Sequence, residues 1–272
     1  MVRAWLAEDV GRGDVTSRTV IPDGTVATAR LEARAGFTVA GLGVAGLCFE
    51  MAGEERGGVE WDPKVEDGHR AEPGATLARV AGNLRAILMA ERTALNVFAR
   101  LSGIATLTSA YAEKLRGTKA RLVDTRKTTP GLRVLEKYAV RVGGGSNHRH
   151  GLDDGILIKD NHIAAAGGIG PAVRAARMNA HHGLKVEVEV EDLAGLGEAL
   201  DAGADIVLLD NMSVDEVRSA VEATAGRALL EVSGGITLDN VEDYARTGVD
   251  LISAGALTHS VHSVDVALEV DL

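Results

Sequence analysis

From about residue 118 onward, the chain alternates short β-rich runs with helical segments, and this pattern restricts the possible folds more than any other feature of the sequence. Such alternation is typical of βα units and therefore of a parallel sheet. A capping box of Ser213 and Glu216 marks the start of one intervening helix, and another helix is expected to start at Thr237 and to stop at Gly248. Six strands in series favour a parallel α/β barrel, with an open doubly wound sheet as the alternative. The expected strands are residues 120–124, 155–159, 185–190, 205–209, 228–232 and 250–253.

The first hundred residues have a different pattern. Residues 25–41 and 74–82 alternate apolar and polar side chains in short runs punctuated by glycine, as antiparallel strands do. An amphipathic helix is expected over residues 85–103. We therefore expect a smaller α+β domain at residues 1–104, followed by the barrel domain at residues 105–257. The C-terminal tail, residues 258–272, is a candidate to pack with the first domain.

Composition excludes several classes of protein. The 46% of hydrophobic residues supports a folded core, while a net charge of −10 and only 3% aromatic residues argue against a nucleic-acid partner. Apolar runs stay well short of the roughly 20 residues that a membrane helix needs, and the first residues lack the apolar stretch of a signal peptide. We expect a cytoplasmic protein without a membrane partner. Cys48 stands alone in an apolar segment, which predicts a buried structural thiol.

Charged residues gather where the expected parallel strands end. In a parallel α/β barrel these positions meet at one mouth, where active sites lie. Because the protein is acidic overall, a concentration of cations there predicts a ligand with several negative charges. Glycines after the last two strands predict a phosphate site built from backbone N–H groups. The residues in question are Thr125, Arg126, Lys127, His148, Arg149, Lys159, Glu187, Glu189, Asp210, and the stretches 233–235 and 254–256.

Each of these elements also has an interpretation without function. An Arg-Lys pair after a strand can be a solvated loop, and a Ser-Gly-Gly stretch can be an ordinary turn. Glu187 and Glu189 would lie on an exposed sheet face in an open-sheet fold, but inside a barrel, where their charge is costly without partners. His148 and His150 resemble a metal-ligand pair, yet no cysteine or third histidine at useful spacing supports zinc. The conjunction at successive strand ends favours a functional site.

Several segments together resemble one family, the quinolinate phosphoribosyltransferases. The longest matching block is residues 124–152, DTRKTTPGLRVLEKYAVRVGGGSNHRHGL, and the resemblance follows the chain in order over nearly its whole length. It implies an α/β barrel with a smaller N-terminal α+β domain, usually dimeric. It also implies transfer of phosphoribosyl from phosphoribosyl pyrophosphate to quinolinate in NAD biosynthesis, releasing pyrophosphate and CO2 and leaving nicotinate mononucleotide. The other matching segments are residues 8–17, 90–106, 158–163, 186–190, 208–211, 233–236 and 255–260.

The resemblance also implies a role for each matched residue. Glu189 and Asp210 would hold the ribose hydroxyls and a magnesium ion that arrives with phosphoribosyl pyrophosphate, with no tightly bound metal, and with Lys127 they form the catalytic set. Arg92 would enter the site of the neighbouring subunit of a homodimer, which can assemble further. The 5′-phosphate would bind Ser233, Gly234, Gly235 and Gly255. Quinolinate and pyrophosphate would bind Thr125, Arg126, Lys127, His148, Arg149 and Lys159.

Three other functions remain open from the residues. A sister transferase of the same fold would act on another acid, such as nicotinate, or be associated with molybdenum transport. A phosphate-binding barrel isomerase or lyase would explain the glycine stretches but not the cations Arg126, Lys127 and Arg149 together. A non-catalytic binding module would explain neither Glu187 nor Glu189 in a barrel interior.

Overall fold

The computed structural model describes residues 1–54 and 56–271, which form two compact units: residues 1–54, 56–107 and 261–271, and residues 108–260. The long helix α4 (Leu84–Lys114) belongs to both units. It begins where the sequence predicts but continues through Gly103, where the predicted helix ended, to Lys114, because one glycine inside a helical pattern does not by itself end a helix. Within the described residues, no helix is both long enough and apolar enough to cross a membrane.

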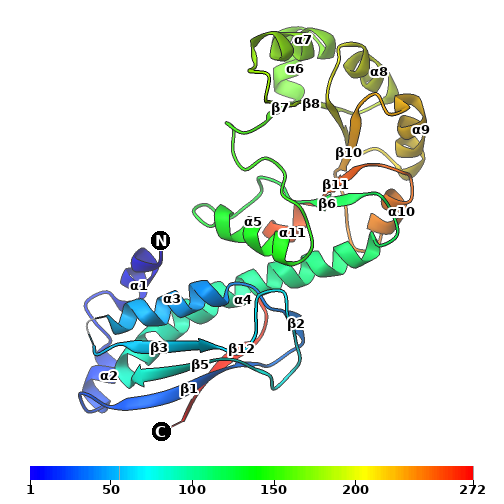
Figure 1. Ribbon diagram of the computed structural model, residues 1–272. Coiled ribbons are helices and arrows are strands. Elements are labelled where there is room, and N and C mark those ends of the chain that lie inside the picture. Colours follow the sequence, from blue (N-terminus) through cyan, green and yellow to red (C-terminus); the bar gives the residue numbers. More distant parts are fainter. Residues whose placement is uncertain (55, 272) are drawn as a thin grey trace. The chain divides into compact units, whose positions relative to one another are not determined.

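The first unit is built on a four-stranded antiparallel sheet in the order β12-β1-β5-β3, and a two-stranded sheet pairs β2 with β4. Helices α3 and α4 lie over one face of the larger sheet (Figure 1). Strand β12, which the sequence pattern did not predict, pairs antiparallel with β1. The elements are α1 (Val2–Val10), α2 (Val15–Val20), β1 (Val26–Ala33), β2 (Phe37–Thr38), α3 (Leu42–Gly53), β3 (Val59–Pro63), β4 (Arg70–Ala71), β5 (Thr76–Asn83) and β12 (Val266–Asp271).

Aromatic rings and small residues fill the core of this unit. The Phe37 and Phe98 rings meet edge to face with centroids 6.1 Å apart, and Phe49 stacks on Trp61 at 5.5 Å. Gly46 makes room for the indole, because a Cβ at this position would lie 2.5 Å from a ring carbon of Trp61. The Cys48 thiol is fully buried, as the sequence predicts, and burial raises its pKa to about 11. This thiol is therefore structural.

The second unit contains a six-stranded parallel sheet in the order β6-β11-β10-β9-β8-β7. Consecutive strands from β7 to β11 are neighbours, and the first strand, β6, pairs with the last, β11. The sheet therefore curves into the predicted barrel instead of reversing its order as a doubly wound sheet does. Helices α7 to α10 lie outside the curve (Figure 1). The elements are β6 (Arg121–Val123), α5 (Arg133–Val142), β7 (Ile156–Ile158), α6 (Asp160–Ala166), α7 (Ile169–Asn179), β8 (Val186–Val190), α8 (Leu193–Asp201), β9 (Ile206–Asp210), α9 (Val214–Thr224), β10 (Leu229–Ser233), α10 (Val241–Ala245), β11 (Leu251–Ser253) and α11 (Ala256–His259).

A non-helical segment lies beside β6, on the side where the barrel strands are not paired with each other. Ser146 forms a parallel bridge to Val123, with its N–H donating to Leu122 O at 2.8 Å and its carbonyl accepting from Asp124 N at 3.2 Å. Arg149 Nη1 donates to Gly155 O, just before β7, at 3.0 Å. Residues 146–149 therefore contact both edges of the sheet.

Candidate active site at the carboxyl ends of the parallel strands

A cavity of about 660 Å³ opens at the carboxyl ends of the barrel strands. The strand-end geometry of a parallel barrel predicts this location. The site residues expected from the sequence lie in its wall, with the exceptions of Arg92 and of Glu187, which is buried in the barrel interior. Those in the wall are Thr125, Arg126, Lys127, His148, Arg149, Lys159, Glu189, Asp210, Ser233, Gly234, Gly235 and Gly255.

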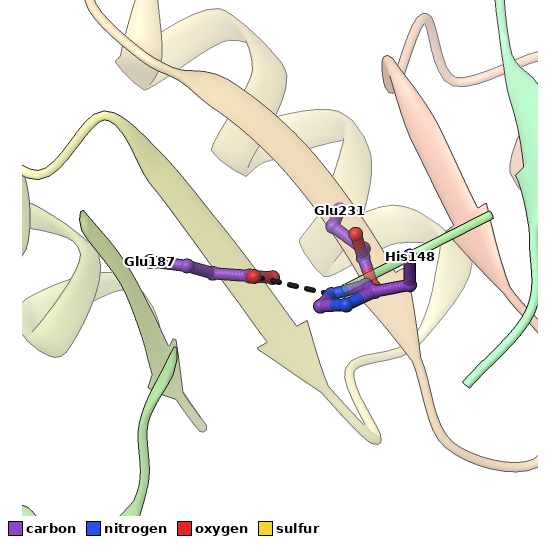
Figure 2. A group of neighbouring side chains, drawn as sticks. All are labelled: His148, Glu187 and Glu231. Atoms are coloured by element: carbon purple, nitrogen blue, oxygen red, sulfur yellow. Dashed lines mark ion pairs between the residues drawn. The ribbon is translucent and has the colours of Figure 1, made fainter. Parts of the chain in front are cut away.

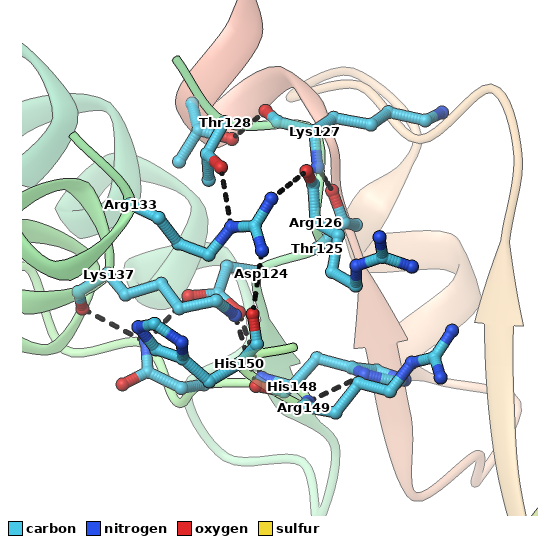
Figure 3. A network of polar contacts seen from close by, with 12 residues as sticks. Asp124, Thr125, Arg126, Lys127, Thr128, Arg133, Lys137, His148, Arg149 and His150 are labelled. Carbon is cyan, nitrogen blue, oxygen red and sulfur yellow. Dashed lines mark hydrogen bonds and ion pairs between the residues drawn. The ribbon is translucent and has the colours of Figure 1, made fainter. Parts of the chain in front are cut away.

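The loop after β6 carries the Arg-Lys pair into the cavity. Lys127 N donates to Thr125 Oγ1 at 3.0 Å, and Lys127 O accepts from Thr258 Oγ1 at 2.8 Å, so the backbone of Lys127 is held at both its N–H and its carbonyl. Gly255 lies against it, since a Cβ there would be 3.0 Å from Lys127 Cδ. Figure 3 shows the Arg126, Lys127 and Arg149 side chains extending to the same side of their loops. These three cations therefore share one wall of the cavity.

Arg133, at the start of α5, joins two of the site loops. Its Nε donates to Thr128 Oγ1 at 2.9 Å, and its Nη2 contacts Arg126 O at 3.5 Å. Its Nη1 donates to His150 O at 3.0 Å (Figure 3). One planar guanidinium thus fixes the loop of Arg126 relative to the loop of His150, a task for which its forked donors are suited.

Below these loops, Asp124 is completely buried and pairs with Lys137 of α5, whose side chain is only 2% exposed. The same carboxylate accepts from Asn147 Nδ2 at 2.6 Å and from His148 N at 2.8 Å. Lys137 Nζ also donates to His148 O at 3.0 Å. A buried ion pair is tolerated when its remaining lone pairs and protons have partners, and here they do. The network fixes the backbone that carries His148.

The His148 ring reaches into the barrel toward two buried acids (Figure 2). Its Nε2 lies 3.1 Å from Glu187 Oε2 and 3.6 Å from Glu231 Oε1. Glu187 faces the interior, as the barrel interpretation predicts. Burial and the charge of Glu187 raise the pKa of Glu231 to about 7. Burial lowers the pKa of His148, but the hydrogen bond to Glu187 and both carboxylate charges outweigh it, and the net direction is upward.

Arg149 is partly buried, whereas Arg126 and Lys127 are exposed. Burial, and then repulsion from Arg126, lower the pKa of its guanidinium. Its Nη1 donates to Gly155 O, while its Nε has no hydrogen-bond partner within residues 1–54 and 56–271. An unpartnered buried donor beside a second guanidinium favours an anionic ligand at this point of the cavity.

The remaining part of the cavity wall combines acids with a glycine turn. Lys159 pairs with Glu189, and Asp210 accepts from Asn211 Nδ2 at 2.7 Å. Gly234 has a φ of 91°, and a Cβ there would lie 2.2 Å from Asn211 Oδ1, so the turn requires glycine. The helix expected to start at Thr237 begins only at Val241, so the 233–235 turn does not lead directly into a helix.

Arg92 lies on α4 in the first unit, outside the cavity wall. Its side chain is 65% exposed, and its Nη2 lies 4.0 Å from Glu91 Oε1. That Arg92 completes the site of a second subunit stays a prediction.

The structure does not bring His148 and His150 together as a pair of possible metal ligands. Among residues 1–54 and 56–271, the acid and histidine side chains close enough to share a cation are His148, Glu187 and Glu231, without His150. The His150 backbone serves the loops instead, since its N–H donates to Asp154 Oδ2 at 2.6 Å.

The sequence reasoning missed the residues that support the site. Arg133, Lys137 and Asn147 lie inside the block of residues 124–152 but not at strand ends, so the strand-end rule does not select them. Glu231 could have been recognised from the sequence. It is an acid inside an apolar run, at the same inward alternation on β10 that Glu187 and Glu189 follow on β8.

Comparison with known proteins shows the family of this chain. The family model described as quinolinate phosphoribosyl transferase, C-terminal domain, matches residues 104–269, and the model of the N-terminal domain matches residues 14–102. The chain belongs to the quinolinate phosphoribosyltransferase family. The nicotinate-nucleotide pyrophosphorylase [carboxylating] of Mycobacterium leprae is 47% identical over 99% of this chain and 95% of that protein.

Solved structures of family members have the same fold. The crystal structure of NadC from Streptococcus pyogenes has a TM-score of 0.94 and 41% identity, covering 98% of this chain and 94% of that chain. The nicotinate-nucleotide pyrophosphorylase from Ehrlichia chaffeensis has a TM-score of 0.94 at 35% identity, covering 99% and 97%. The family fold therefore extends over both units of this chain.

Proposed function

We propose that this protein transfers the phosphoribosyl group of phosphoribosyl pyrophosphate to quinolinate, releasing pyrophosphate and CO2 and forming nicotinate mononucleotide. The observation that carries the proposal is the cavity at the strand ends, in which Arg126, Lys127 and Arg149 share one wall although the protein has a net charge of −10. Such a set of cations suits a dicarboxylate together with a pyrophosphate. Membership of the quinolinate phosphoribosyltransferase family supports this choice of substrates.

In this proposal the cations bind the carboxylates and the pyrophosphate, and the glycine turn binds the 5′-phosphate. Thr125, Arg126, Lys127, Arg149 and Lys159 take the quinolinate carboxylates and the pyrophosphate, with His148 beneath them. The 5′-phosphate takes the turn of Ser233, Gly234 and Gly235 together with Gly255, whose lack of side chains leaves backbone N–H groups accessible.

The chemistry requires little covalent assistance from the protein. When the bond from the ribose C1′ to pyrophosphate breaks, the electron pair leaves with pyrophosphate and positive charge develops on the sugar. The carboxylates of Glu189 and Asp210 in the cavity wall stabilise that charge, while Lys127 and the arginines stabilise the leaving group. The quinolinate nitrogen bonds to C1′. The carboxylate at ring position 2 then leaves as CO2, the electron pair of the broken C–C bond stays on that ring carbon next to the positively charged nitrogen, and a proton takes its place there.

Magnesium fits the same acids. Glu189 and Asp210 supply the carboxylate oxygens that Mg²⁺ prefers, and the ion would arrive on phosphoribosyl pyrophosphate and neutralise part of its charge. The proposal further places the enzyme in the cytoplasm as a homodimer in which Arg92 completes the partner's site.

Pyrophosphate release tests this function. Purified protein with phosphoribosyl pyrophosphate and magnesium should release pyrophosphate with quinolinate and should be nearly inactive with nicotinate. Equal or faster release with nicotinate would contradict the proposal and assign the protein to a sister transferase.

A further inference from the structure

His148 lines the cavity, but both of its ring nitrogens are engaged within the protein. Nε2 lies 3.1 Å from Glu187 Oε2. Nδ1 accepts the backbone N–H of Arg149 at 2.7 Å. In this arrangement neither nitrogen is available to a ligand, so the ring must act through the residues it contacts.

The partners define which nitrogen carries the proton. Nδ1 accepts an N–H and therefore has none, so the proton of the neutral ring lies on Nε2 and is donated to Glu187. A metal ion on Nε2 would need that nitrogen's lone pair and a proton on Nδ1, which is the opposite tautomer. The geometry of His148, Glu187 and Glu231 therefore favours a proton over a metal ion between these groups.

The two acids are deeply buried, with Glu187 4% and Glu231 1% exposed. Glu187 Oε1 and Glu231 Oε1 have no hydrogen-bond partner within residues 1–54 and 56–271. Two neighbouring buried carboxylates do not both ionise readily, which agrees with the raised pKa of Glu231. One carboxylate therefore remains to accept the His148 proton.

The imidazole links this barrel interior to the cavity wall. The backbone N–H of His148 donates to Asp124 Oδ1 at 2.8 Å, and the Nδ1 of its ring accepts the backbone N–H of Arg149. The Arg149 guanidinium, with its unpartnered Nε, is the group presented to the cavity. We propose that Glu187 is a positioning residue that fixes His148 in the Nε2–H tautomer, so that the imidazole fixes the backbone of Arg149 and aims its guanidinium at the substrate. The effect on catalysis rests on the proposed function, whereas the tautomer does not.

Nitrogen-15 NMR of labelled histidines tests the tautomer without any substrate. The His148 signals are assigned by their loss in His148→Gln. Wild-type protein and the control Glu191→Gln, an exposed acid just after β8, should show the proton on Nε2. Glu187→Leu should show a mixture of tautomers, while Glu187→Gln, which keeps an acceptor oxygen, should retain the wild-type signal. A proton on Nδ1 in the wild type would overturn the proposal, as would selective loss of the His148 signals on addition of one equivalent of MnCl2.

Kinetics then test the positioning role. Glu187→Leu should raise the KM for quinolinate about tenfold, the size expected for losing one hydrogen bond, with kcat changed less than threefold. Glu187→Gln should stay within threefold of wild type in both. If the carboxylate charge were what mattered, Gln would be as damaging as Leu, and the proposal would fail.

A double variant separates action through His148 from independent action. Glu187→Leu combined with His148→Ala should be no worse than His148→Ala alone, because both remove the same link. Losses that multiply would show that Glu187 acts by another route. If no variant or wild-type protein turns over quinolinate, the proposed function fails while the NMR result still decides the tautomer.

Discussion

Breaking the buried pair of Asp124 and Lys137 should be among the most destabilising single changes in the barrel unit. Lys137→Met removes the ammonium but keeps the unbranched stem, and it leaves Asp124, which is 0% exposed, without its counter-ion. Loss of one partner of a buried pair costs about 3–5 kcal/mol. Because Asn147 and the His148 N–H still donate to the carboxylate, we expect a cost near the lower end, about 3 kcal/mol.

Urea unfolding measures this cost, followed by a probe within residues 108–260 so that variants are compared in the same transition. The matched control is Lys119→Met, which breaks the pair with Asp250 at 2.8 Å, where the side chains are 59% and 25% exposed. It should cost less than about 1 kcal/mol, as exposed pairs do. If Lys137→Met cost no more than Lys119→Met, the buried network would not hold the site loops as argued.

Three further predictions concern the site. Lys127→Ala should lower kcat/KM at least about a hundredfold with the fold intact, and a loss below threefold would remove Lys127 from the substrate contacts. Arg92→Ala and Glu189→Ala should each be nearly inactive, yet a co-expressed mixture should recover roughly one quarter of wild-type activity, by the counting that two-fold symmetry imposes. No recovery after demonstrated subunit exchange would refute the shared site. The pKa of Glu231 is raised from its ordinary value of 4.5 to about 7, so the folded protein holds this proton more tightly than the unfolded chain. The free energy of unfolding should therefore decrease as the pH rises from 4.5 to 7, and Glu231→Gln should make that decrease smaller when unfolding is measured across this range.

The sequence was sufficient to predict the barrel and its mouth because both follow from local patterns. Each β-rich run that predicted a barrel strand overlaps a strand of the structure, and the carboxyl ends of the strands in a parallel barrel converge on one mouth. The capping box of Ser213 and Glu216 is confirmed, with Ser213 N donating to Glu216 Oε2 at 2.8 Å. Cations at strand ends therefore lie together in the cavity wall without any knowledge of tertiary contacts.

The residues that hold the site loops, and some other elements of the fold, could not be predicted from such local patterns. Lys137 meets Asp124 only because α5 packs beside β6, and no spacing rule links a helix residue to a strand end across an intervening loop. The C-terminal strand β12 depends on its pairing with β1, which lies more than two hundred residues earlier in the chain. The helix expected from Thr237 was wrong in its start, because Asn240 and Thr237 form a turn first, with Thr237 N donating to Asn240 Oδ1 at 2.8 Å.

The most direct test of the account is the fate of the quinolinate carboxyl group at ring position 2. Purified protein is given quinolinate labelled with carbon-13 in that carboxyl, phosphoribosyl pyrophosphate and magnesium, and the products are followed by NMR and mass spectrometry. The account predicts labelled CO2 and unlabelled nicotinate mononucleotide in equal amounts, with one pyrophosphate for each. A nucleotide that retains the label, or release of labelled CO2 without phosphoribosyl pyrophosphate, would contradict it.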